Sequence, residues 1–149
     1  MEIERKFLVK TLPDNLDQYK KLHIEQGYLS IVPEVRVRNK DDKYFMTVKG
    51  EGTISRPEYE IQISRDVYTE LSSHIHGQLL CKDRYIIPID NHTGELDVYT
   101  NFNNLIVIEV EFDNFQSAND FKAPSWFGKE VTKDKDFKNK NLSKILGEV

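Results

Sequence analysis

The chain lacks the features that mark several large classes of protein. Cys81 is its single cysteine, which excludes an internal disulfide and is typical of a protein kept in a reducing compartment. No apolar run approaches the roughly 20 residues needed to cross a bilayer, and no apolar signal segment follows Met1. We therefore expect a cytoplasmic protein without a membrane partner, whose N-terminal residues enter a strand directly.

The motifs of several catalytic classes are also missing. The sequence has no glycine-rich phosphate loop, no Cys/His cluster with zinc spacing and no Ser-His-Asp arrangement, so covalent catalysis by a nucleophile is a poor interpretation. The net charge of −4 argues against a nucleic-acid partner but allows a small anionic ligand, because local placement of charge matters more than the sum. At 149 residues we expect a single domain over 1–149.

What the sequence does contain is a charged row at its N-terminus. Glu2, Glu4 and Lys6 occupy alternate positions, which a strand places on one face. Carboxylate oxygens hold a hard cation such as Mg²⁺, and an ammonium group meets a phosphate oxygen. The row therefore suits a magnesium-bound polyphosphate.

The same spacing recurs in later segments that are rich in β-branched and aromatic residues. Their charged members are Arg36, Arg38, Lys49, Arg56, Glu58, Glu60, Lys82, Arg84, Glu95, Asp97, Glu109 and Glu111. An ordinary sheet with one solvated face explains any single segment. The signs are segregated by segment, however, and the rows are almost pure charge. A closed barrel with a charged lumen explains this better, since acidic strands would bind metal and basic strands the phosphates.

The pattern predicts a mostly β (α+β) fold, an eight-stranded antiparallel closed barrel with a few covering helices. Strands are expected near 2–9, 24–32, 34–39, 43–49, 55–63, 79–87, 92–100 and 105–113, with turns at 40–42 and 91–94. Short helices are expected from Pro13, over 67–75, over 115–121 and over 142–146. These helices, with Trp126 and Phe127, would cover the apolar outer face, and a homodimer would cover the rest.

Taken together, these segments resemble the CYTH-domain proteins of the triphosphate tunnel metalloenzyme family. The Glu-x-Glu-x-Lys signature of that family is similar to Glu2-Ile3-Glu4-Arg5-Lys6. The resemblance continues over nearly the full length, through 26–29, 35–38, 46–49, 56–61, 82–85, 95–98, 108–112 and 126–132. The ordered set of segments is far more specific than the opening motif alone.

The resemblance implies a tunnel that binds a triphosphate with one or two Mg²⁺ or Mn²⁺ ions. By analogy, Glu2, Glu4 and Glu111 are candidates for a first metal, and Glu60, Asp97 and Glu109 for a second metal or for positioning the attacking water. The phosphate chain would be held by Lys6, Arg36, Arg38, Lys49, Lys82 and Arg84. Arg56 and Glu58 are further candidates for phosphate and metal, although they could instead pair with each other; Gln26 and Tyr28 are candidates at the edge of the site. Lys6, Glu60 and Glu109 are the catalytic candidates.

The activity that the resemblance implies is metal-dependent hydrolysis of a triphosphate-containing small molecule, most directly inorganic tripolyphosphate, by a metal-activated water. The chain shows no insertion that would build an adenine pocket, and its motifs are most similar to those of compact bacterial tripolyphosphatases. Two alternatives stay open: an adenylate cyclase of the class IV type that makes cyclic AMP from ATP, and a non-catalytic module that binds polyphosphate or nucleotides.

Overall fold

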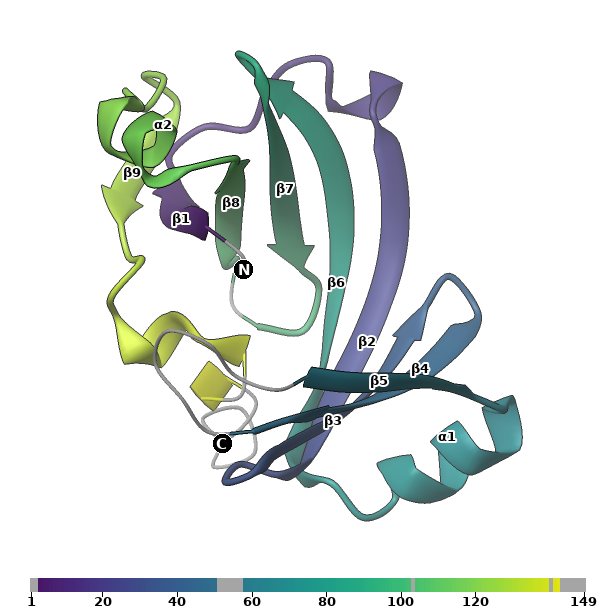
Figure 1. The fold of residues 1–149 in the computed structure, drawn as a ribbon. Coiled ribbons are helices and arrows are strands. Elements are labelled where there is room, and N and C mark those ends of the chain that lie inside the picture. Colours follow the sequence, from purple (N-terminus) through teal and green to yellow (C-terminus); the bar gives the residue numbers. More distant parts are fainter. Residues whose placement is uncertain (1–2, 51–57, 103, 140, 143–149) are drawn as a thin grey trace. The chain divides into compact units, whose positions relative to one another are not determined.

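The computed structural model describes residues 3–50, 58–102, 104–139 and 141–142. The chain divides into two compact units, of which the first contains Met1–Leu22 and Asp83–Asp134 and the second contains His23–Lys82 and Lys135–Val149. Both consist mainly of antiparallel strands; the helix Phe115–Asp120 belongs to the first unit and the helix Arg65–Ser72 to the second (Figure 1). The predicted mostly β fold is confirmed.

The strands are β1 (Ile3–Val9), β2 (Lys20–Ser30), β3 (Glu34–Lys40), β4 (Lys43–Lys49), β5 (Glu58–Ile63), β6 (His76–Ile89), β7 (His92–Tyr99), β8 (Ile106–Phe112) and β9 (Phe127–Glu130). Their hydrogen-bonded order is β5-β4-β3-β2-β6-β7-β8-β1-β9. In this order β5 and β9 are the end strands, and no pairing joins them within the described part of the chain. The closed barrel is therefore not confirmed.

The core of the first unit lies on one face of its strands. Side chains at alternate positions of β1, β6, β7 and β8 pack together there with α2 (Phe115–Asp120) and β9, as in the contacts of Phe7 with the rings of Phe121 and Phe127. Figure 1 shows α2 and β9 beside β1. The prediction that a helix and Phe127 cover an apolar face is confirmed for this unit, and it leaves the opposite face of the same strands for charged residues.

Arg5 holds α2 and β9 against β1 from the apolar side. Its guanidinium donates two hydrogen bonds to the Glu130 carboxylate, at 3.0 and 2.6 Å, and two to the backbone oxygens of Ala118 and Phe121, at 2.8 and 3.1 Å. Its Cζ also lies 5.2 Å from the centre of the Phe7 ring. Arg5 thus links three elements, while its neighbour Lys6 points to the other face.

We expect Arg5→Ala to lower the free energy of unfolding by about 2 kcal/mol, because charge-assisted hydrogen bonds to α2 and β9 are lost. The pair with Glu130 is partly exposed, so the loss should be smaller than four such bonds suggest. Urea unfolding measures the change, and Lys129→Ala, which removes an exposed neighbouring charge, is the matched control. An unchanged midpoint for Arg5→Ala would contradict this role.

The same contact predicts a pH dependence. The hydrogen bond from Arg5 lowers the pKa of Glu130. The contribution of the Arg5–Glu130 pair to stability is therefore present above the unfolded pKa of glutamate, about 4.3, and is lost as the pH falls through the lower folded pKa. The difference between the wild type and Arg5→Ala should therefore shrink in acid.

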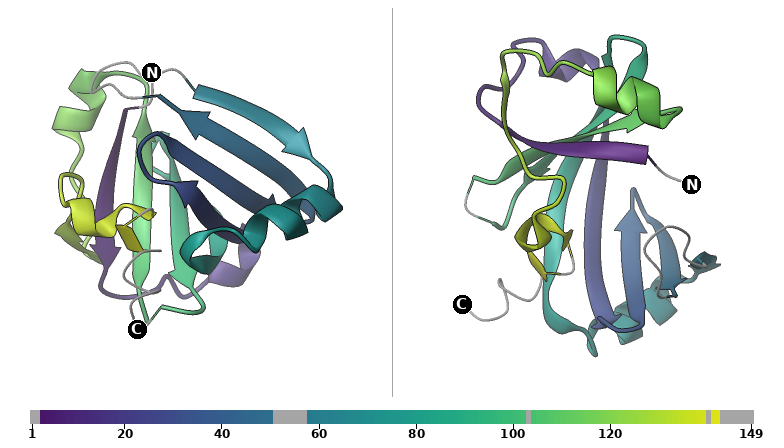
Figure 2. Two further views of the ribbon diagram at one scale, coloured as in Figure 1. Left: turned by 90° about the horizontal axis from the view of Figure 1, so that it is seen from below. Right: turned by 60° about the vertical axis from the view of Figure 1, so that its left-hand side comes forward.

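The second unit places a helix on one face of its strands. Helix α1 (Arg65–Ser72) begins at Ser64, whose hydroxyl accepts a hydrogen bond from the Val67 amide at 3.1 Å. It contacts β3 and β4, and Figure 2 shows it lying across these strands. Its Tyr68 is buried with the ring centre 5.0 Å from that of Tyr44 on β4. As in the first unit, the helix-covered face leaves the other face to polar side chains.

Short segments are where the prediction and the structure differ. Strand β9 was not predicted, because four residues that include Gly128 are too short to reveal an alternating pattern. The helix expected from Pro13 is a single 3₁₀ turn, Leu16–Gln18, and Ile75 lies beyond the end of α1. The expected C-terminal helix lies almost wholly outside the described residues. Strands β2 and β6 are longer than predicted.

Gly94 belongs to a strand rather than to the predicted turn over 91–94. The turn is formed at Asp90, which has a left-handed φ of 53°, and Asn91. Gly94 lies inside β7, where an added Cβ would stand 2.8 Å from Cγ1 of Ile89. Glycine is therefore required here by close packing on the core face, and not by a turn. The turn predicted at 40–42 is confirmed, with Asp41 and Asp42 at φ of 49° and 65°.

Candidate functional site

A charged face covers the side of the first unit that is opposite its apolar core. We call it the first charged face, and it consists of Glu4 and Lys6 on β1, Arg84 on β6, Glu95 and Asp97 on β7, and Glu109 and Glu111 on β8. The register pairs Glu4 with Glu111 and Lys6 with Glu109 across β1 and β8, and Glu109 with Glu95 across β8 and β7. The alternation predicted from the sequence thus brings these seven side chains onto one surface.

Glu4 and Glu111 meet as like charges in this register, and both are exposed. Carboxylates directly opposite each other on neighbouring strands destabilise the pair unless a cation lies between them. Within the described residues, no three His, Cys, Asp or Glu side chains form a metal-ligand group. The pair still fits Mg²⁺ or Mn²⁺, because such ions bind hard oxygen ligands and often take one or two carboxylates together with water and substrate phosphates.

Lys6 is the basic side chain that β1 contributes to this face. Its Nζ lies 3.4 Å from Oε1 of Glu109, and the two side chains are 13% and 19% exposed. They are thus shielded from bulk water but still accessible. An ammonium in this position can exchange part of its contact with a carboxylate for a phosphate oxygen.

Arg84 is held by two carboxylates of β7. Its Nε and Nη2 donate to the two oxygens of Asp97 at 2.8 and 3.0 Å, and its Nη1 donates to Glu95 at 3.0 Å. Burial lowers the pKa of Arg84, but the hydrogen bonds and charge of Asp97, with the charges of Glu95 and Glu109, outweigh it and raise the pKa. This network joins β6 to β7, and within it Arg84 and Asp97 bind each other.

The second unit carries a second charged face on the side away from α1. Its members are Gln26 and Tyr28 on β2, Glu34, Arg36 and Arg38 on β3, Thr47 and Lys49 on β4, and Glu58 and Glu60 on β5. The register pairs Tyr28 with Arg36 and Gln26 with Arg38, continues from Arg36 to Thr47 to Glu60, and pairs Lys49 with both Glu34 and Glu58. This face therefore brings together three of the predicted phosphate ligands, Arg36, Arg38 and Lys49.

Arg36 is more buried than Arg38, the other arginine of this face. Its Nη2 lies 3.4 Å from the Thr47 hydroxyl and 4.0 Å from Oε1 of Glu60, and its side chain is 10% exposed. Its buried Nε has no hydrogen-bond partner among the described residues. Lys49 has a looser contact, with Nζ 3.9 Å from Oε2 of Glu34. A fixed guanidinium with an available donor suits an anionic ligand.

Gln26 and Tyr28 were expected at the edge of the site, but both are fully buried. The Gln26 amide donates to the Tyr28 hydroxyl at 2.9 Å. Burial raises the pKa of Tyr28 to about 12, with the positive charge of Arg36 acting against it. The hydroxyl therefore stays protonated at neutral pH.

Sequence reasoning set Thr47 beside Lys49 on this face but gave it no role in the site, and it missed Glu34 altogether. The available signal was their spacing, since Thr47 is two residues from Lys49 and Glu34 is two residues from Arg36. A threonine and a single glutamate are common on exposed strands, so this spacing alone did not indicate a role in the site. Of the remaining predicted site residues, Lys82 is completely buried on β6. Glu2 and Arg56 lie outside the described residues.

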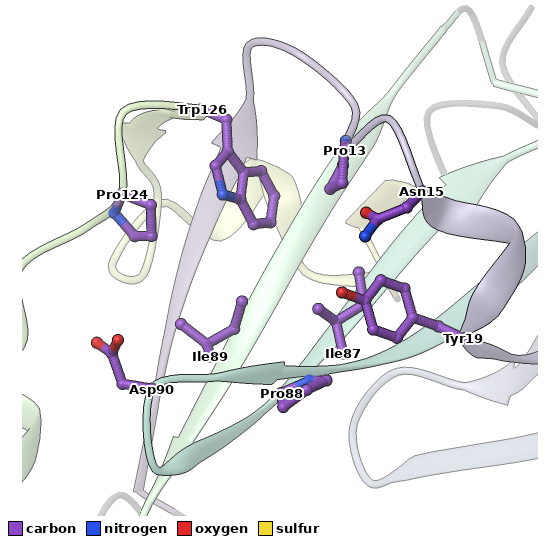
Figure 3. Close-up of a pocket in the computed structure, with 9 residues that line it drawn as sticks. All are labelled: Pro13, Asn15, Tyr19, Ile87, Pro88, Ile89, Asp90, Pro124 and Trp126. Atoms are coloured by element: carbon purple, nitrogen blue, oxygen red, sulfur yellow. The ribbon is translucent and has the colours of Figure 1, made fainter.

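A pocket of about 270 Å³ lies in the first unit but away from the first charged face. It is lined by Pro13, Asn15, Tyr19, Ile87, Pro88, Ile89, Asp90, Pro124 and Trp126, and Figure 3 shows Trp126 and Tyr19 flanking its apolar floor of Ile87 and Ile89. Asp90 is its only charged side chain. A single carboxylate repels phosphate, so this pocket does not suit a polyphosphate ligand.

No helix in the described part of the chain has the length and apolar character required to cross a membrane.

Comparison with known proteins gives a consistent result. The family described as CYTH domain matches residues 1–144. An inorganic triphosphatase of Nitrosomonas europaea is 43% identical over 95% of this chain and 96% of its own, and one of Acetivibrio thermocellus is 36% identical over 96% and 93%. A crystal structure of an inorganic triphosphatase has a TM-score of 0.79 at 40% identity, covering 97% of this chain and 95% of that one. The resemblance predicted from the sequence is therefore confirmed: the chain belongs to the CYTH domain family.

Proposed function

We propose that this protein is a divalent-metal-dependent hydrolase of triphosphates and that inorganic tripolyphosphate is its substrate. Membership of the CYTH family and similarity to inorganic triphosphatases over almost the whole chain support this activity. The observation that carries it is the register of β1 and β8, which sets Glu4 against Glu111 and Lys6 against Glu109 on one face. Carboxylates and an ammonium are thereby placed side by side, as a metal-bound phosphate chain requires.

The carboxylates of the first charged face would hold the cation. Glu4 and Glu111, with Glu2, are our proposed ligands of a first Mg²⁺ or Mn²⁺ ion. When bound, the cation offsets the negative charge of the phosphates and makes water more acidic. Glu109, Asp97, Glu60 and Glu58 stay proposed ligands of a second ion or groups that orient the attacking water. Of these, Asp97 is engaged by Arg84 and Glu109 by Lys6.

The basic side chains would position the substrate and stabilise charge in the transition state. Lys6 lies next to the proposed metal ligands on β1, and Arg36 retains an unpartnered Nε among the described residues. Phosphoryl transfer depends mainly on such positioning and electrostatic stabilisation, because the phosphate chain itself carries the reacting bonds. We propose the same role for the other predicted phosphate ligands: Arg38, Lys49, Arg56, Lys82 and Arg84.

Other expectations from the sequence stay predictions. They are a single domain over 1–149, a closed barrel with a charged lumen, a cytoplasmic location and a homodimer. Exposed Tyr59 and Ile61 on β5, at 69% and 54%, supply apolar surface that a second copy could cover.

A substrate panel tests the proposed function. Purified protein is incubated with tripolyphosphate, ATP or thiamine triphosphate, with Mg²⁺, Mn²⁺ or excess chelator, and orthophosphate and cyclic AMP are measured. We expect orthophosphate release from tripolyphosphate that requires the metal and stops with chelator. Cyclic AMP made from ATP would instead favour the cyclase, and tight binding without turnover under every metal condition would favour a binding module.

A further inference from the structure

Thr47 occupies the central position of a cross-strand row in the second unit. The register places it between Arg36 on β3 and Glu60 on β5. Its hydroxyl donates to Oε1 of Glu60 at 2.9 Å and receives a hydrogen bond from Nη2 of Arg36 at 3.4 Å. Thr47 is 1% exposed, whereas the Glu60 side chain is 46% exposed. The hydroxyl is therefore a fixed link beneath a carboxylate that can reach solvent.

The direction of this link is set by chemistry. A guanidinium only donates hydrogen bonds and an ionised carboxylate only accepts them, so the hydroxyl must accept from Arg36 and donate to Glu60. Threonine is β-branched and stiff at χ1, which holds the hydroxyl in place. Without it, Nη2 of Arg36 and Oε1 of Glu60 would close from their present 4.0 Å ion pair to hydrogen-bonding distance.

We propose that Thr47 is a positioning residue that keeps Arg36 and Glu60 from closing on each other. It holds Oε1 of Glu60, so that Oε2 is left for a cation or a water molecule. It also leaves the buried Nε of Arg36, which has no partner among the described residues, to donate to a phosphate oxygen. This inference rests on the proposed function, because it assigns Arg36 and Glu60 to the same ligand class.

Two substitutions at Thr47 separate the hydroxyl from the shape of the side chain. Thr47→Val keeps the branched shape and removes the hydroxyl, and Thr47→Ser keeps the hydroxyl. We expect Thr47→Val to lower both kcat/KM for tripolyphosphate and the affinity for metal-free tripolyphosphate by about 10-fold or more, the equivalent of one charge-assisted hydrogen bond. Thr47→Ser should restore most of both. Thr69→Val on α1, an exposed threonine bonded to a backbone oxygen, is the matched control and should change neither.

Repeating the Thr47→Val substitution in a Glu60→Gln variant distinguishes positioning from simple packing. In Glu60→Gln there is no carboxylate to capture Arg36, so adding Thr47→Val should change the affinity for tripolyphosphate less than about 2-fold. An equal loss in both backgrounds, or wild-type affinity in Thr47→Val alone, overturns the inference.

Calorimetry of tripolyphosphate binding needs no turnover. A wild type that binds tripolyphosphate but never hydrolyses it would therefore overturn the proposed activity and still decide the role of Thr47. A wild type that does not bind tripolyphosphate would overturn both.

Discussion

Glu4→Gln and Glu111→Gln should each lower kcat for tripolyphosphate by at least about 100-fold, which corresponds to roughly 2.7 kcal/mol of transition-state stabilisation. Each substitution removes one of two carboxylates that face each other across β1 and β8. The amide that replaces it has nearly the same shape, but it is a much weaker ligand for a hard cation. Affinity for Mg²⁺ should fall together with turnover.

The fold should survive these changes, and this separates them from general damage. Because two like charges oppose each other at this point, neutralising one should leave the metal-free protein as stable as the wild type, or slightly more stable. Binding of Mg²⁺ to the native state should raise the melting temperature of the wild type but not that of the variants. Glu70→Gln on α1, an exposed carboxylate with 78% of its side chain accessible, is the control. Wild-type turnover in Glu4→Gln or in Glu111→Gln would remove the proposed metal site.

Arg84→Met should have the largest effect on stability, a loss of about 3–5 kcal/mol. The Asp97 side chain is only 5% exposed, and Glu95 shares the same guanidinium. Removing Arg84 leaves a buried carboxylate without its cation, which costs far more than the pair itself contributes. Asp97→Asn in the same chain should recover part of the loss. Denaturant unfolding measures both.

Lys21→Met provides the comparison for an exposed ion pair in the same unit. Lys21 is 54% exposed and lies 3.7 Å from Asp83, so its removal should cost less than about 1 kcal/mol.

The Arg84→Met experiment also decides between a structural role and a substrate-binding role for Arg84. If Arg84→Met unfolds like the wild type while KM for tripolyphosphate rises, Arg84 binds substrate and does not chiefly hold β6 to β7.

Alternation along strands allowed much of this arrangement to be predicted. Glu4, Lys6, Glu109 and Glu111 share one face because side chains repeat every two residues, and that period is visible in the sequence. The same rule sent Arg5 to the opposite face, where it binds Glu130. The helix-covered apolar faces followed from the same reasoning.

Pairing between side chains was harder to predict, because it depends on which strands are neighbours and in what register. Nothing local in the sequence shows that Arg84 is bonded to Asp97 and Glu95 on the next strand. The hydroxyl of Thr47 was overlooked because its importance comes from the charges on either side of it. Gly94 was assigned to a turn because the sequence alone does not distinguish a glycine that bends the chain from one that leaves room for a packed side chain, here Ile89.

Strand β1 pairs with segments that lie far from it along the chain. The amide of Lys6 donates to the hydroxyl of Thr132, 126 residues further along the chain, and the Lys6 carbonyl accepts from Val131. Contacts of such long sequence separation slow folding, and synthesis proceeds from the N-terminus. Strand β1 therefore cannot complete its pairing until β8 and β9 have been synthesised, so the nascent chain cannot set Glu4 against Glu111 before these later strands emerge from the ribosome.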